Sequence, residues 1–153
     1  MFKLSPLPLK TLQFKKNLSR PQSGAISIFE GIVRNHNEGK KVVALEYEAF
    51  AKLAEKEAEE IFAEARKKFD IQKIACLHRI GKLSVGETAV WVGVSAGHRD
   101  AAFQACRYTI DEIKRRLPIW KKEYYKNGDS GWVNCEPCHC EENSRKIRAD
   151  EAI

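Results

Sequence analysis

The sequence lacks any apolar run approaching the ~18 residues that a membrane-spanning helix requires. Residues 1–17 hold only short apolar pieces, interrupted by Pro6, Pro8 and several lysines, so they lack the continuous apolar core of a secretory signal. These absences argue against membrane and exported classes and predict a cytoplasmic protein.

Internal repeats and low-complexity tracts are also absent. A chain of 153 residues, with 43% hydrophobic and 31% charged residues, is long enough to bury a core without disulfide or metal staples. We therefore expect one domain over residues 1–153, with a lead-in segment at 1–23 and a tail at 134–153.

Cysteine is scarce and odd in number, at five residues. Without an export signal, this favours free thiols over a disulfide framework. The segment Cys135–Cys140 contains a CxxCH core, which formally matches haem attachment or part of a zinc site. Haem attachment is typical of exported chains, and Cys76, His78 and Cys106 do not supply an obvious second ligand pair. We expect neither a metal nor a cofactor here, with both kept as alternatives.

The net charge is +6 and the sequence pI is about 9.1. This balance favours anionic partners, either polyanions or small acidic substrates. No zinc-finger or RNA-recognition signature accompanies the basic residues. A non-catalytic basic module that binds nucleic acid or an acidic protein remains the alternative to an enzyme.

After a lead-in segment that contains a short helix, hydrophobic periodicity predicts strands and helices in the order β-β-α-β-β-α, followed by a tail. Such an order indicates an α+β domain, with helices on one face of a largely antiparallel sheet. The first two strands are expected to form a hairpin, and residues 81–86 are expected to form a connection. Strands are predicted at 25–33, 42–49, 73–80 and 88–95, and helices at 9–18, 52–69 and 98–117.

The helix at 98–117 organises the rest of the chain. Helical projection places Lys114 on the flank of an apolar stripe, where we expect it to be half-buried, and turns Arg115 and Arg116 well away. Arg107 lies on the same flank as Lys114. The stripe consists of Phe103, Cys106, Ile110, Ile113 and Leu117.

Cationic residues gather near the predicted ends of strands and helices. Arg34 ends a strand, His98 and Arg99 begin the last helix, and Lys114 and Lys121 lie near its end. Helix N-termini attract anions, arginine binds phosphate in bidentate geometry, and a partly desolvated lysine can transfer protons near neutral pH. An anion site is one interpretation; surface residues whose stems cover a core edge are the other.

Two tryptophans, Trp120 and Trp132, bracket a Lys- and Tyr-rich segment. Aromatic residues interleaved with lysines can hold a base or a pterin-like ring. They can equally cover the edge of a core, so both interpretations stay open.

Four ordered motifs over roughly residues 24–133 give the chain a family resemblance. The motifs are FEGIVRNHN at 29–37, LHRIGKLSVGE at 77–87, VGVSAGHRDAAF at 92–103 and IKRRLPIWKKE at 113–123. With these motifs the chain resembles the large, catalytic subunit of molybdopterin synthase.

The resemblance implies an activity and partners. Such an enzyme converts cyclic pyranopterin monophosphate to molybdopterin by inserting two sulfurs as a dithiolene, in molybdenum cofactor biosynthesis. The sulfur arrives as a C-terminal thiocarboxylate on a small ubiquitin-like subunit. Two large subunits form a homodimer within a heterotetramer. The implied fold is an α/β hammerhead-type domain with an additional antiparallel β-subdomain.

The resemblance also implies residue roles. Lys114 and Lys121 match the two catalytic lysines of the family. One departure is the tail, where residues 134–136 replace a position at which the family often has a basic residue. The implied substrate-binding residues are Ile32, Val33, Arg34, His98, Arg99, Lys122 and Glu123.

Overall fold

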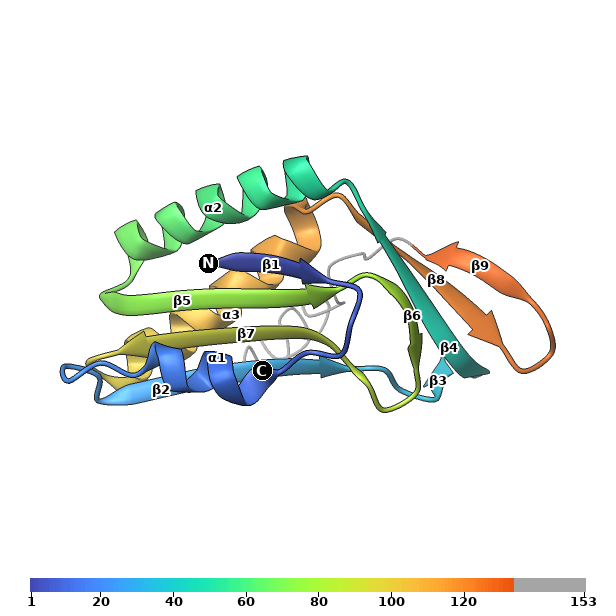
Figure 1. Cartoon of the computed structure of the whole chain (residues 1–153), viewed down its shortest axis with the longest axis horizontal. Helices are drawn as coiled ribbons and strands as arrows, with labels where there is room; N and C mark the ends of the chain where they lie inside the picture. Colours follow the sequence, from blue (N-terminus) through green and yellow to red (C-terminus); the bar gives the residue numbers. More distant parts are fainter. Residues whose placement is uncertain (134–153) are drawn as a thin grey trace, which may run out of the picture.

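The computed structural model describes residues 1–133 of the chain, and within them it contains two β-sheets and three helices (Figure 1). The helices are α1 Thr11–Leu18, α2 Ala51–Lys68 and α3 Arg99–Arg116. The strands are β1 Phe2–Ser5, β2 Ala25–Ile32, β3 His36–Asn37, β4 Lys40–Ala49, β5 Ile71–Arg79, β6 Gly81–Ser84, β7 Thr88–Ala96, β8 Ile119–Tyr125 and β9 Ser130–Val133.

The first sheet has the strand order β1-β5-β7-β2. Its β1–β5 pair is parallel, whereas β5–β7 and β2–β7 are antiparallel. Strand β7 is buried from Ala89 to Ala96, as its continuous apolar sequence predicts for a central strand covered on both faces. This confirms the expectation of a largely antiparallel sheet.

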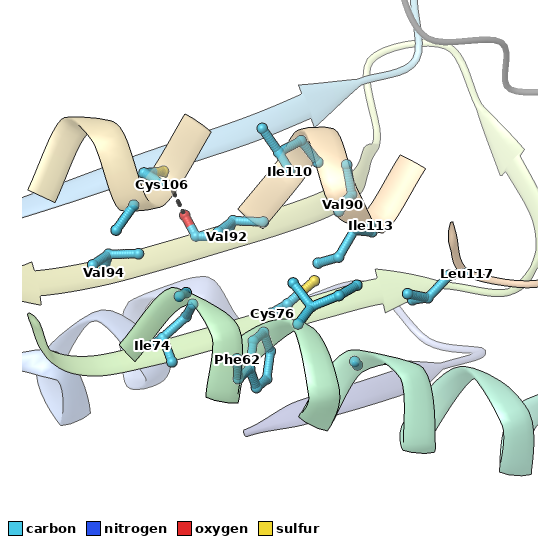
Figure 2. Packing of buried hydrophobic residues seen from close by; sticks show 14 of the residues in the cluster. Phe62, Ile74, Cys76, Val90, Val92, Val94, Cys106, Ile110, Ile113 and Leu117 are labelled. Carbon is cyan, nitrogen blue, oxygen red and sulfur yellow. Dashed lines mark hydrogen bonds between the residues drawn. The ribbon is translucent and has the colours of Figure 1, made fainter. Parts of the chain in front are cut away.

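Helices cover both faces of this sheet. Alternate residues of β5 point to opposite sides: Cys76 packs in the main core with α2 and α3 (Figure 2), whereas Leu77 packs with Leu18 of α1 and Trp91. The two helices of the predicted order, α2 and α3, share one face as expected, and α1 of the lead-in segment lies on the other face. Its short apolar side, ending at Leu18, covers the face that α2 and α3 leave open.

The second sheet has the order β3-β4-β8-β9, with β6 paired to β4, and every pair in it is antiparallel. The predicted hairpin between the first two long strands is wrong, because β2 pairs with β7 and β4 pairs with β6 and β8. The predicted connection at 81–86 contains β6, and the sequence interpretation missed β8 and β9. In Figure 1 this sheet lies beyond one end of the first.

Helix α3 packs against both the first sheet and α2. Its buried side therefore includes small residues, Ala102, Ala105 and Thr109, in addition to most of the predicted stripe. The buried side of α3 is therefore rotated about the helix axis relative to the predicted stripe. This rotation leaves Phe103 63% exposed and Lys114 exposed, so the predicted burial of Phe103 and half-burial of Lys114 are wrong.

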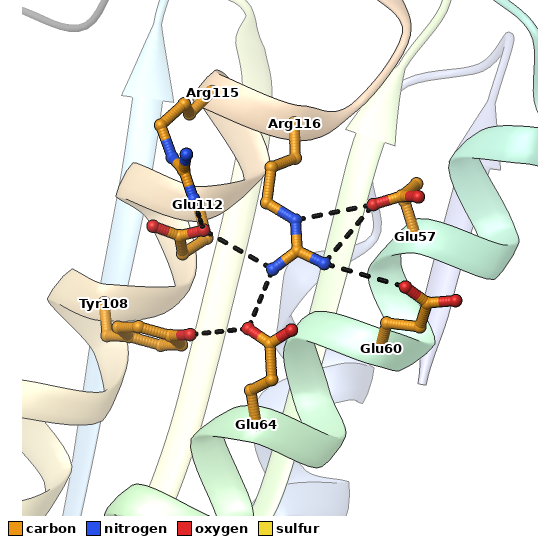
Figure 3. A network of polar contacts seen from close by, with 7 residues as sticks. All are labelled: Glu57, Glu60, Glu64, Tyr108, Glu112, Arg115 and Arg116. Carbon is orange, nitrogen blue, oxygen red and sulfur yellow. Dashed lines mark hydrogen bonds and ion pairs between the residues drawn. The ribbon is translucent and has the colours of Figure 1, made fainter.

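The same rotation turns Arg116 toward α2, contrary to the projection. Its guanidinium lies 2.7 Å from Glu64, 3.3 Å from Glu57 and 3.5 Å from Glu112 (Figure 3). Tyr108 donates a further hydrogen bond to Glu64, and burial together with this bond raises the pKa of Tyr108 to about 12. This network fixes the last turn of α3 on α2.

Within residues 1–133, no helix combines the length and the apolar character needed to cross a membrane.

Candidate active site

A cavity of about 320 Å³ lies at the C-terminal end of α3, between the two sheets. Its apolar wall comes from α3 and the ends of β2 and β7. Its polar wall comes from the second sheet and from the segment after β2. Lining residues include Gly31, Ile32, Arg34, His36, Asn37, Tyr47, His78, Val90, Ile110, Ile113, Lys114, Leu117, Lys121 and Glu123.

Lys114 reaches the cavity from the last turn of α3. Its Nζ atom lies 6.0 Å from the ring centroid of Phe29. The negative end of the helix dipole favours a cation at this position. Because Lys114 is exposed, its ammonium group can contact a ligand without breaking a core contact.

Lys121 reaches the cavity from β8 and is held by a buried carboxylate. Its Nζ atom lies 3.0 Å from Oε1 of Glu123, whose side chain is only 3% exposed. Tyr125 donates to Oε2 of the same carboxylate at 2.7 Å. Alternate residues of β8 share a face, so 121, 123 and 125 all point toward this polar wall.

Arg34 and Asn37 complete the polar wall. Asn37 donates from Nδ2 to both oxygens of Glu123, at 3.0 and 3.2 Å, and accepts from Arg34 at 3.3 Å. Burial of Glu123 opposes ionisation, but the bonds from Tyr125, Lys121 and Asn37 outweigh it and lower the pKa of Glu123. The carboxylate of Glu123 thus stays charged. It contacts Lys121 directly and is connected to Arg34 through Asn37.

Three of the five predicted cations meet in the cavity: Arg34, Lys114 and Lys121. His98 and Arg99 do not line it. They are exposed at the other end of α3, and the ~1.5 Å rise per residue puts Arg99 roughly 22 Å from Lys114 along the axis. Arg107 is also outside the cavity, next to Asp111.

Among the other predicted binding residues, Ile32 and Glu123 line the cavity, but Val33 and Lys122 do not. The Val33 side chain is 2% exposed in a small core, and its backbone bonds with Glu87 and Gly86. Lys122 points to the opposite face of β8, where its Nζ lies 5.7 Å from the Trp132 ring centroid and 5.3 Å from that of Tyr124.

His78, Tyr47 and Asn37 also line the cavity, although none was predicted as a site residue. Each of these residues lies in a motif or a predicted strand, and the sequence pattern around it indicates secondary structure but no role in a site. A polar residue at an inward position of a strand, as His78 is on β5, was the signal available in the sequence.

An apolar wall facing convergent cations suits a flat ring with an anionic group. Within residues 1–133, no group of three or more His, Cys, Asp or Glu is arranged to hold a metal ion. The segment Cys135–Cys140 lies outside the described residues. The exposed Trp120 and Trp132 flank the face of β8 opposite the cavity.

Comparisons with known proteins agree with the motifs. The family model described as MoaE protein matches residues 4–116. The molybdopterin synthase catalytic subunit of Thermoplasma volcanium is 44% identical over 124 residues, which cover 81% of this chain and 90% of the relative. The human protein of the same name is 44% identical over 124 residues, which cover 81% of this chain but 65% of the relative.

A solved structure has the same fold. The crystal structure of molybdopterin synthase from Staphylococcus aureus superimposes with a TM-score of 0.82 at 36% sequence identity, covering 86% of this chain and 96% of that chain. The match includes most of the described residues. Together with the family model over residues 4–116, it shows that the chain belongs to the MoaE protein family.

Proposed function

We propose that the chain is the catalytic subunit of a molybdopterin synthase, which inserts two sulfurs into cyclic pyranopterin monophosphate in molybdenum cofactor biosynthesis. The observation that carries the proposal is the convergence of Arg34, Lys114 and Lys121 on one partly apolar cavity in a MoaE-family chain. The cations suit the phosphate, and the apolar wall suits the ring.

Lys114 and Lys121 are the proposed catalytic residues. Sulfur insertion displaces oxygen from carbon, and this requires protons to be delivered to leaving oxygen atoms and charge to be stabilised nearby. Ammonium groups on two walls of one cavity can serve both needs. Glu123 keeps Lys121 in place, while Arg34 and Ile32 contact the substrate in this proposal.

The sulfur must come from a partner, because the part of the cavity that the structure describes contains no cysteine. We propose a small ubiquitin-like subunit with a thiocarboxylate at a Gly-Gly terminus. Glycine suits such a tail because a backbone without side chains can enter a narrow channel. The name of the relatives, catalytic subunit, fits an enzyme with a further subunit.

A homodimer of large subunits within a heterotetramer is also part of the proposal. His98 and Arg99 are too far from the cavity of their own chain to bind its ligand, so we assign them to an anion site that a second copy would complete. The roles of Val33 and Lys122 are indirect here, through the segments that hold Arg34 and Lys121. The α/β hammerhead description and a cytoplasmic location belong to the proposal as well.

The test uses the purified chain, cyclic pyranopterin monophosphate and a small subunit in two forms. We expect dithiolene product with the thiocarboxylated small subunit and none with the ordinary carboxylate form or with the chain alone. Sustained product from the chain alone, with sulfide excluded, would overturn the partner assignment. The alternative, a basic module that binds nucleic acid, predicts binding to generic DNA that weakens steeply as the salt concentration rises. A compact cavity for a small anionic ligand predicts little binding to generic DNA.

A further inference from the structure

His78 is a polar residue on the floor of the cavity that the roles proposed above do not use. It is the eighth residue of β5, Ile71–Arg79, and it points to the same side of the sheet as Cys76. Its whole residue is 8% exposed, and it lines the cavity together with Val90, its partner on β7. Burial of a polar imidazole costs free energy unless its nitrogen atoms form hydrogen bonds, so the partners of both ring nitrogens matter.

The orientation of the ring is fixed on two sides. Nδ1 lies 2.7 Å from the backbone carbonyl oxygen of Arg79. The Tyr47 ring meets the imidazole edge to face, with centroids 5.0 Å apart and an interplanar angle of 83°. A carbonyl oxygen only accepts, so Nδ1 carries the hydrogen and Nε2 of the neutral ring carries the lone pair.

The neutral form is the stable one in this setting. Burial lowers the pKa of His78 to about 4, and the positive charge of Lys114 adds to this effect against the bond to Arg79. The other charged or titratable groups around the cavity are Arg34, His36, Tyr47, Lys121 and Glu123. Within residues 1–133, Nε2 forms no hydrogen bond.

Nε2 of His78 supplies an acceptor that the cations of the cavity cannot supply. Arg34, Lys114 and Lys121 offer only N–H donors to a ligand. The carboxylate of Glu123 already accepts from Lys121, Asn37 and Tyr125. A pterin ring presents N–H donors as well as acceptors, and a donor enclosed in a cavity without an acceptor costs binding free energy.

We propose that His78 is a substrate-recognition residue whose Nε2 atom accepts a hydrogen bond from an N–H or O–H group of the bound ring system. This inference rests on the proposed function for the identity of the ligand. In this arrangement the cations bind the phosphate, and His78 recognises the ring system through a hydrogen bond.

The first experiment measures binding by calorimetry with two probes, cyclic pyranopterin monophosphate and inorganic phosphate. His78→Phe keeps the ring contact with Tyr47 but removes the acceptor, and we expect a 10- to 100-fold higher Kd for the pterin. The Kd for inorganic phosphate should not change. His78→Gln can place its amide oxygen near the position of Nε2, so it should recover most of the affinity.

The matched control is Cys76→Ala, which alters a fully buried residue on the same face of β5 outside the cavity lining. We expect pterin binding within about twofold of the unchanged chain. Equal losses in His78→Phe, His78→Gln and Cys76→Ala would show a packing effect and overturn the proposal. Failure of the unchanged chain to bind the pterin would count against the proposed function instead.

A second experiment needs no substitution. Nitrogen-15 NMR of labelled histidine distinguishes the two neutral tautomers and the imidazolium form. We expect His78 to be neutral with its hydrogen on Nδ1 at pH 7, and its Nε2 resonance to shift when the pterin saturates the site. A hydrogen on Nε2, an imidazolium at pH 7 or an unchanged Nε2 resonance at saturation would overturn the assignment, whatever the variants do.

Discussion

The Lys121 ammonium group and the Glu123 carboxylate form a 3.0 Å ion pair on one face of a single strand, with the carboxylate buried and the lysine directed into the cavity. Residues two apart on a strand share a face, so this pair forms without any turn or crossover. The arrangement makes the position of Lys121 depend on a residue that is already committed to Tyr125 and Asn37.

Glu123→Gln should therefore lower activity and stability together. The amide keeps the shape but loses the charge to which three donors are directed, and bonds to a charged group contribute about 1.5–3 kcal/mol each. We expect a loss of about 2 kcal/mol in the free energy of unfolding and at least a tenfold drop in kcat. Denaturant unfolding and product assays measure the two effects. Wild-type kcat in a stably folded variant would contradict the positioning role.

Lys114→Ala should separate activity from stability. The side chain is exposed and contributes little packing, whereas loss of a proton-transfer group costs about 100-fold or more in rate. We expect an unchanged melting temperature and kcat reduced by that factor, with Lys121→Ala equal or slightly milder. Arg115→Ala, one residue along the same helix turn and outside the cavity, is the control. A Lys114→Ala protein with near-normal turnover would refute the catalytic assignment.

Arg116→Met should destabilise the packing of α3 on α2. The substitution leaves the carboxylates of Glu57, Glu64 and Glu112 close together without their shared cation. We expect a loss of about 2 kcal/mol, since removal of one partner from a partly buried ionic network costs more than loss of a surface pair. Added salt should restore part of this loss by screening the carboxylates.

Arg116→Lys keeps the charge but not the planar fork that reaches several carboxylates, so it should be intermediate. Arg115→Ala, which loses only the exposed pair with Glu112, should change stability by less than about 0.5 kcal/mol. Equal effects at positions 115 and 116 would show that the network contributes no more than ordinary surface charge.

Stability should depend on pH through His78. Its pKa is lowered from 6.5 to about 4 on folding, so between these values the unfolded chain binds a proton that the folded chain does not. Stability should therefore fall as the pH drops from about 7 toward 4, by up to about 3 kcal/mol for this group. The lowered pKa of Glu123 acts in the same direction, as the pH falls through and below its ordinary value of 4.5.

His78→Phe removes the first contribution and should flatten the stability profile between pH 6.5 and 5. Urea unfolding at a series of pH values tests this. A variant whose stability falls as steeply as that of the unchanged chain over this interval would show that His78 does not titrate as described.

The sequence predicted those helices and strands whose own apolar pattern indicates which of their residues are buried. Helix α2 and strand β7 were found because a helical apolar face and a continuous apolar strand are local signals. Strand β8 was missed because Lys121 and Glu123 belong to the polar wall of the cavity, which removes the apolar alternation that identifies a strand. The pairing of β4 was wrong because neighbours in the chain are not always neighbours in a sheet.

Among the site residues, the resemblance indicated Arg34, Lys114 and Lys121, which the fold brings to one cavity. It also indicated His98 and Arg99, which a single chain holds at the far end of α3. Arg116 and His78 were not recognised because their surroundings come from other segments: α2 for the first, and α3 with β4 for the second. No spacing within one helix or strand carries that information.

The pairing of distant segments has a consequence for how the protein acquires its cavity. The N-terminal amine bonds to the carbonyl of Ile74, 73 residues away, and Tyr124 bonds to Glu46, 78 residues away. Contacts of such high sequence separation slow folding, because long loops must close before the contacts form. A chain leaving the ribosome cannot build the polar wall until β8 has emerged, so the cavity is among the last features to form during synthesis.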